Sequence, residues 1–181
     1  MPDLFIIFAF VMIISIALRY IHDKARELLT LSAWLMVTLL SAQGRYSVAG
    51  VEFGKHHDAV VRVLVAQYGL PSQESNGVLG YENLKYDGME FSKADFMFNK
   101  QGKLNEAHFI LYVSSKLQAE KKLDELEKQL SKRYSVSEDW DDSGKFVKGG
   151  LGPDGQSLFT IYKVRLNGVW QLRLRYGAFN I

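Results

Sequence analysis

The chain has 181 residues, of which 48% are hydrophobic and 23% charged, with no cysteine and a formal net charge of +2. Without cysteine it cannot form a disulfide scaffold, a thiol catalyst, a cysteine-containing zinc site or a lipidated N-terminal cysteine. The aromatic content of 13% argues against a disordered chain, and the nearly balanced charge argues against a nucleic-acid-binding surface.

The first 43 residues are predicted to form a hydrophobic leader, because about two-thirds of them are hydrophobic. Two apolar runs cover residues 4–21 and 28–40, with a basic stretch between them. Residues 24–42 have the pattern of a secretory signal peptide, with basic residues, an apolar core and small residues before a cleavage site after Ala42. We therefore expect the rest of the chain to be exported, into the periplasm or beyond the cell.

The run at 4–21 leaves two explanations open, because no basic residue precedes it. In the first, the start codon is assigned too far upstream. In the second, residues 4–40 form a membrane hairpin whose basic connection stays inside. The protein is then a membrane-tethered accessory subunit that uses this hairpin for its interaction.

Residues 44–113 are predicted to form a first α+β unit. A short strand over 45–53 is followed by a helix with an apolar stripe from Val60 to Tyr68, which ends at Gly69 before a proline. Three antiparallel strands are then expected over 78–86, 89–99 and 104–113.

Residues 114–181 are predicted to repeat this plan. A capping box begins at Ser115, and a helix follows with the apolar stripe Ala119, Leu123, Leu126, Leu130 and Tyr134. Short strands over 136–140 and 145–148 precede a loop at 151–155. Strong strands over 158–166 and 169–176 flank Asn167-Gly168, a typical two-residue hairpin turn.

This turn fixes the register of the last hairpin, so its two faces follow from the sequence. The face expected to bury against the helix carries Phe159, Ile161, Trp170, Leu172, Leu174 and Tyr176. The face expected to remain solvated carries Thr160, Tyr162, Val164, Gln171, Arg173 and Arg175.

The solvated face contains residue types that are common in binding sites. Tyrosine and arginine are enriched at binding hot spots, and Thr160 and Gln171 add hydrogen-bonding groups. Thr160, Tyr162, Gln171, Arg173 and Arg175 are therefore our candidate binding residues, with an ordinary solvated sheet face as the alternative.

The fold class expected is thus α+β, with two helix-plus-antiparallel-meander repeats and both helices on one side of the sheet. The segments Phe53-Gly54-Lys55-His56 and Tyr68-Gly69-Leu70-Pro71, followed by a meander, resemble the SmpA/OmlA lipoprotein group and the tandem β-lactamase-inhibitor-protein-like fold. The chain is similar, over about residues 48–180, to secreted proteins of Bacteroidetes-type bacteria with two such units. It departs from the lipoprotein group in three ways: His56 stands where that pattern usually has a Ser or Thr cap, the first predicted helix is longer, and the lipidated cysteine is missing. The resemblance implies binding or scaffolding rather than catalysis.

Three further patterns contain residue types that can carry chemistry. His56 and His57 begin a helix, but adjacent helical residues point about 100° apart and cannot easily share a metal ion. The acidic stretch 138–142 lacks the spacing of a calcium loop. The glycine-rich stretch 149–155 lacks the Lys-Ser/Thr of a phosphate loop and is predicted to be a plain loop. We therefore expect no catalytic residue, metal or cofactor.

The leading functional hypothesis is an exported, non-enzymatic binding or envelope-assembly module. It would present its open sheet face to an envelope or secreted protein, with no nucleic-acid partner and membrane contact only through the leader. The second hypothesis is the membrane-tethered subunit described above. The third is a small envelope hydrolase or metal-dependent enzyme, which would have to gather His56, His57 and His108.

Overall fold

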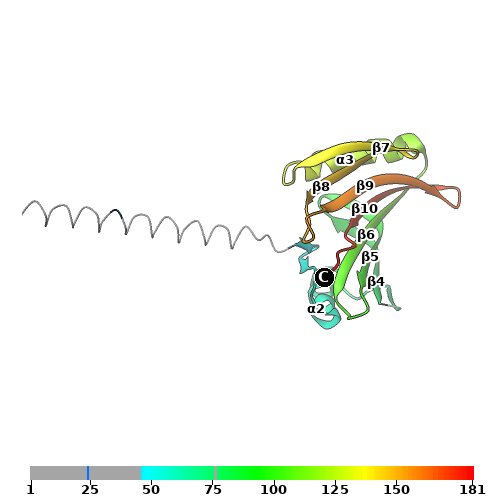
Figure 1. Ribbon diagram of the computed structural model, residues 1–181. Helices are drawn as coiled ribbons and strands as arrows, with labels where there is room; N and C mark the ends of the chain where they lie inside the picture. The colour runs from blue at the N-terminus through cyan, green and yellow to red at the C-terminus, as the bar shows by residue number, and fades with distance from the viewer. Residues whose placement is uncertain (1–23, 25–45, 76) are drawn as a thin grey trace, which may run out of the picture. The chain divides into compact units, whose positions relative to one another are not determined.

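The computed structural model describes residue 24, residues 46–75 and residues 77–181 (Figure 1). The chain divides into two compact units, Met1–Gly44 and Arg45–Ile181. The second unit, called the body below, contains all the elements described. The predicted signal peptide at 24–42 and the hairpin of 4–40 lie outside the described residues, apart from Lys24. None of the helices within the described ranges has the length and hydrophobicity needed to cross a membrane.

The body contains two helices and ten strands that the structure describes. They are β1 (Ser47–Val48), β2 (Val51–Glu52), α2 (His57–Tyr68), β3 (Gln73–Ser75), β4 (Val78–Tyr86), β5 (Met89–Phe98), β6 (Leu104–Val113), α3 (Lys116–Leu130), β7 (Val136–Asp141), β8 (Gly144–Leu151), β9 (Ser157–Leu166) and β10 (Val169–Tyr176). The bounds of β4, β6 and β10 agree with the sequence prediction, and those of β5 and β9 differ by one residue.

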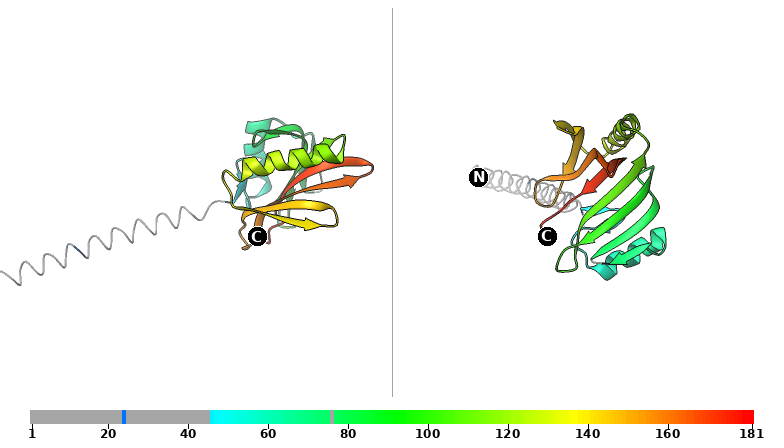
Figure 2. Two further views of the ribbon diagram at one scale, coloured as in Figure 1. Left: turned by 90° about the horizontal axis from the view of Figure 1, so that it is seen from above. Right: turned by 90° about the vertical axis from the view of Figure 1, so that its right-hand side faces the viewer.

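Eight strands form one antiparallel sheet in the order β3-β4-β5-β6-β10-β9-β8-β7. Helix α2 is followed along the chain by β3 to β6, and α3 by β7 to β10. The last strands of these two series, β6 and β10, pair at the centre of the sheet. Figure 2 shows the strong twist of the sheet. The α+β class and the large antiparallel sheet are therefore as predicted.

Both described helices lie on the same face of the sheet. The stripe Ala119, Leu123, Leu126 and Leu130 is buried, and α3 lies against β6, β9 and β10. On α2, the ring of Tyr68 lies 6.1 Å from that of Tyr81 in β4. Tyr81 in turn contacts Phe96, which contacts Phe109 beneath α3. A single core thus fills the helix side of the sheet.

Ion pairs hold the polar side of α3 to the sheet. Lys145 Nζ on β8 lies 2.8 Å from carboxylate oxygens of both Glu127 and Glu138, and 3.3 Å from one of Asp124. Burial alone would lower the pKa of Lys145, but the hydrogen bonds to these three carboxylates raise it overall. Lys145 therefore links the helix to β7 and β8.

Two local predictions were wrong because of glycine. Residues 45–53 form a tight hairpin of β1 and β2 rather than one strand, since Ala49 and Gly50 have positive φ angles and reverse the chain. Gly149 and Gly150 lie inside β8 rather than in a loop. A Cβ atom at Gly149 would overlap the ring of Phe159, so glycine at this position lets that ring cross the strand.

Candidate functional site

The candidate binding residues lie together on the sheet face opposite the helices, called the open face below. In the β9–β10 hairpin, Arg173 pairs with Tyr162, Arg175 with Thr160, and Gln171 with Val164. The hairpin register therefore agrees with the one derived from the Asn167-Gly168 turn. Of the five candidates, Gln171 is buried and the other four are half-buried.

The pairing of distant strands adds residues that sequence analysis missed. Arg173 lies between Ile110 on β6 and Tyr162 on β9, and Tyr162 pairs with Phe146 on β8. The result is a row of two aromatic rings, one aliphatic side chain and one guanidinium across four neighbouring strands, called the Arg173 row below. Because successive side chains of a strand point to opposite faces, the sequence places Ile110 and Phe109 on different faces of the sheet. Only the strand order shows which residues are neighbours of Ile110.

The open face is more closely packed than the expected solvated surface. Gln171 is 8% exposed and Ile110 is 7% exposed, although both described helices lie on the other side of the sheet. Arg173 Nε donates a hydrogen bond of 2.9 Å to Gln171 Oε1. We attribute this burial to the long side chains of neighbouring strands, which cover one another on a strongly twisted sheet.

A polar network lies next to the Arg173 row, toward the start of β6. Arg175 Nε donates to Glu106 Oε1 at 2.6 Å, and His108 Nε2 lies 2.8 Å from the same oxygen. The hydrogen bond from His108 is the main cause of a lowered pKa for Glu106, and the charge of Arg175 adds to it. Glu106 therefore holds Arg175 and His108 in place on the open face.

We expect Glu106→Gln to destabilise the protein in a pH-dependent way. At pH 7 it should lower the free energy of unfolding by about 1 kcal/mol, because it weakens two charge-assisted hydrogen bonds. A carboxylate with a lowered pKa in the folded state stabilises it above the unfolded-state pKa, and this contribution disappears as the pH falls through the folded value. The difference between variant and wild type should therefore shrink below the ordinary glutamate value of 4.5.

The measurement is urea unfolding at several pH values from about 7 down to about 3, spanning the glutamate titration. Three ionisable side chains lie near Glu106: His108 on the same strand, Arg175 on β10 and Asp95, which pairs with His108 from β5. Glu82→Gln is the control, since Glu82 is an exposed glutamate of β4. If the difference in unfolding free energy between Glu106→Gln and wild type stayed constant with pH, the lowered pKa of Glu106 would be contradicted.

A hollow of about 550 Å³ adjoins the network. Lys148, Thr160 and Arg175 line it from three neighbouring strands, and the loop around Asp154 and the C-terminal residues close it. Thr160 thus lies between two cationic side chains at the rim of this hollow. Polar side chains dominate this end of the open face.

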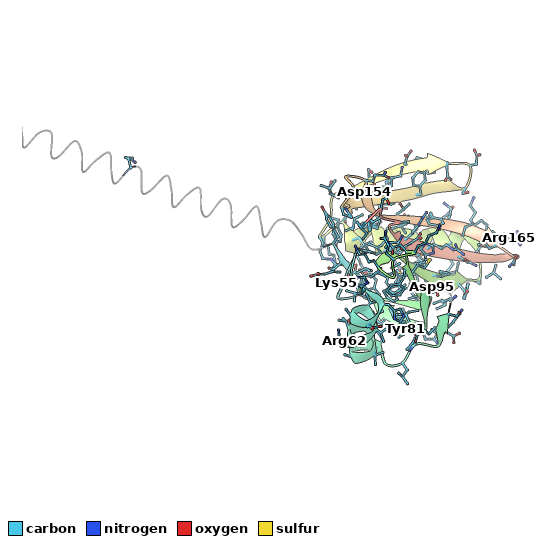
Figure 3. All side chains as sticks on the ribbon, turned by 60° about the horizontal axis from the view of Figure 1, so that its bottom comes forward. Lys55, Arg62, Tyr81, Asp95, Asp154 and Arg165 are labelled. Carbon is cyan, nitrogen blue, oxygen red and sulfur yellow. The ribbon has the colours of Figure 1, made fainter. Side chains whose placement is uncertain are left out.

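The other end of the open face is apolar. Leu166 and Val169 pair beside the β9–β10 turn and are 41% and 45% exposed. Tyr112, at the end of β6, is 48% exposed. Figure 3 shows Arg165 at the tip of this hairpin and Lys55 at the opposite end of the body. The open face thus changes from polar to apolar along its strands.

The fold does not bring together the histidines that were considered for a metal site. His57 begins α2 and lies within 3.3 Å of carboxylate oxygens of Asp58 and Glu74, whereas His108 lies on the open face. Across residues 46–75 and 77–181, no three His, Asp or Glu side chains form a group able to hold a metal ion. The acidic stretch at 138–142 belongs mostly to β7, an exposed edge strand.

Comparison with models of known protein families, with curated proteins and with solved structures found no match to this chain.

Proposed function

We propose that the body is a non-enzymatic binding module that docks a protein partner on its open face. The Arg173 row carries this proposal. It combines an arginine, a tyrosine and a phenylalanine, which are residue types enriched in binding interfaces. It lies on the one sheet face that neither described helix covers, and Phe146, Tyr162 and Arg173 are partly exposed there, whereas Ile110 is buried beside them.

The shape of the face supports a protein rather than a small molecule. Residues of four neighbouring strands contribute to the row. The surface is extended, with a polar hollow at one end and exposed apolar side chains at the other. A broad surface that combines apolar and polar side chains is typical of protein interfaces, whereas small ligands usually occupy enclosed pockets.

We further propose that the module acts in the cell envelope after export. The signal-peptide pattern at 24–42 and the resemblance to SmpA/OmlA-like modules support this location. The order of a helix followed by four antiparallel strands, present twice along the chain, supports a tandem repeat of that kind. The membrane-tethered alternative depends on residues 4–40 and remains a separate proposal.

A capture experiment with the full-length chain tests the open face. Tagged protein, solubilised in mild detergent, is incubated with envelope extract, and bound proteins are compared between wild type and Tyr162→Ala/Arg173→Ala/Arg175→Ala. We expect at least one partner to be captured by wild type and lost, by about tenfold or more, with the triple variant.

The control variant Arg62→Ala/Arg165→Ala also removes two arginines, but Arg62 lies on α2 and Arg165 belongs to the helix side of the sheet. It should capture the same partners as wild type. Equal recovery of every protein by all three forms would exclude this face as the binding surface.

A further inference from the structure

The charges around the Arg173 row are balanced except at Arg173 itself. The basic side chains that surround it on the open face each lie 2.6–3.7 Å from a carboxylate: Lys93 with Asp95, Arg175 and His108 with Glu106, and Lys148 with Asp139. Within the described part of the chain, Arg173 has no such neighbour, and its guanidinium donates through Nε to the neutral side chain of Gln171. Its two terminal nitrogens form no hydrogen bond with any described residue.

The surroundings of Arg173 make this imbalance costly. Arg173 is half-buried, with Ile110 and Tyr162 as its neighbours on the adjacent strands and Phe146 one strand further. Partial burial among apolar side chains removes water from a cation, and a carboxylate that forms paired hydrogen bonds with a guanidinium offsets that loss. Of the five arginines in the described part, Arg133 and Arg175 pair with carboxylates and Arg62 and Arg165 are exposed. Arg173 alone among them is half-buried without a carboxylate.

We propose that Arg173 recognises a carboxylate of the partner, an aspartate or glutamate side chain flanked by apolar residues. The inference rests on the proposed function and adds the chemistry of the segment that docks. The carboxylate accepts hydrogen bonds from the two terminal nitrogens of Arg173, and the flanking apolar side chains contact the half-buried rings of Tyr162 and Phe146. Charge complementarity selects this occupant, because an acidic group is what the open face itself lacks at this position.

A peptide selection tests this chemistry directly, whichever protein the partner is. A phage library of random dodecapeptides is selected on the immobilised full-length chain in detergent. We expect enriched peptides to contain Asp or Glu next to aliphatic or aromatic residues. Exchange of that acid for its amide in a synthetic peptide should weaken binding at least tenfold, and so should Arg173→Gln in the protein.

Two variants test whether binding needs the planar guanidinium and its position on the open face, rather than a positive charge alone. Arg173→Lys keeps the charge but loses the planar pair of donors, so it should restore only part of the affinity. Arg165→Gln is the matched control, because Arg165 lies on the same hairpin, also lacks a carboxylate partner among the described residues, and faces the helix side. It should bind the selected peptides as wild type does.

A stability measurement distinguishes recognition from a structural role. If Arg173 is an uncompensated charge, Arg173→Gln should leave the midpoint of urea unfolding unchanged or raise it. A clearly lowered midpoint would overturn the proposal, because it would mean that the guanidinium stabilises the fold.

The outcomes also separate this inference from the proposed function. Peptides that need Tyr162 but tolerate Arg173→Gln would leave the open face as a binding surface and overturn carboxylate recognition. Peptides that are insensitive to both Tyr162→Ala and Arg173→Gln would contradict the proposed function itself. Self-association of the full-length chain that Arg173→Gln abolishes would replace the partner protein by a second copy of this chain.

Discussion

Replacement of Phe109 by alanine should lower the free energy of unfolding by about 4 kcal/mol. Phe109 is fully buried at the centre of β6. Its ring stacks on Tyr86 with centroids 4.4 Å apart and lies 5.3 Å from the ring of Phe91. Phe96 and Tyr176 approach its edge at 5.9 and 6.2 Å. Alanine therefore removes the shared contact of four aromatic rings and leaves a cavity among them.

Urea unfolding of the full-length chain, followed by near-ultraviolet circular dichroism, measures this effect. Phe109→Leu keeps most of the volume and should cost less than about 1.5 kcal/mol, so it provides a folded variant if alanine prevents folding. Tyr112→Ala removes an aromatic ring from the other face of the same strand, where it is 48% exposed. Tyr112→Ala should cost no more than about 1 kcal/mol, and equal costs for Phe109→Ala and Tyr112→Ala would contradict the assignment of the core to the helix side.

Gly149→Ala should lower the free energy of unfolding by about 2–3 kcal/mol. A Cβ atom there would lie 2.9 Å from Phe159 Cε2 and from Val136 Cγ1, and closer still to Phe159 Cζ. Phe159 is buried, and its ring contacts Tyr134 and Tyr176, so it has little freedom to move aside. The added methyl group must displace an aromatic ring of the core.

The control for this prediction is Gly80→Ala in β4. A Cβ atom at Gly80 would lie 3.3 Å from Asp95 Oδ1, on a side chain that can rotate, and 3.3 Å from Gln73 Cβ, in the short exposed edge strand β3. Gly80→Ala should therefore cost about 1 kcal/mol or less. Phe159→Leu should relieve part of the strain of Gly149→Ala, giving a double variant less destabilised than the sum of the single effects. Simple additivity would show that Phe159 is not the group displaced.

Local patterns predicted most of the elements of this fold. The spacing of Ala119, Leu123, Leu126 and Leu130 identified the buried stripe of α3, because the helix turns once per 3.6 residues. Tyr134, predicted as the fifth member of this stripe, lies beyond the end of the helix. The Asn167-Gly168 turn fixed the register of β9 and β10, and hence the face that carries Tyr162 and Arg173. In both cases the determining contacts lie only a few residues apart in the sequence.

Features that depend on distant contacts could not be predicted in this way. The pairing of β6 with β10 makes Ile110 a neighbour of Arg173, and the pairing of β8 with β9 adds Phe146 to the row. Gly149 was predicted to lie in a loop because it begins the glycine-rich stretch 149–155. Its place in β8 follows from the close approach of Phe159, which only the assembled sheet brings about.

The position of the β6–β10 seam has a consequence for the kinetics of folding. All other neighbours in the large sheet are consecutive strands of the chain, but Val113 and Trp170 pair at a separation of 57 positions. Closing so long a loop costs entropy before its contacts form, so this step should limit the folding rate. Changes at Leu172 and Leu174 in the seam should slow folding, whereas changes in the outer β7–β8 hairpin should mainly accelerate unfolding.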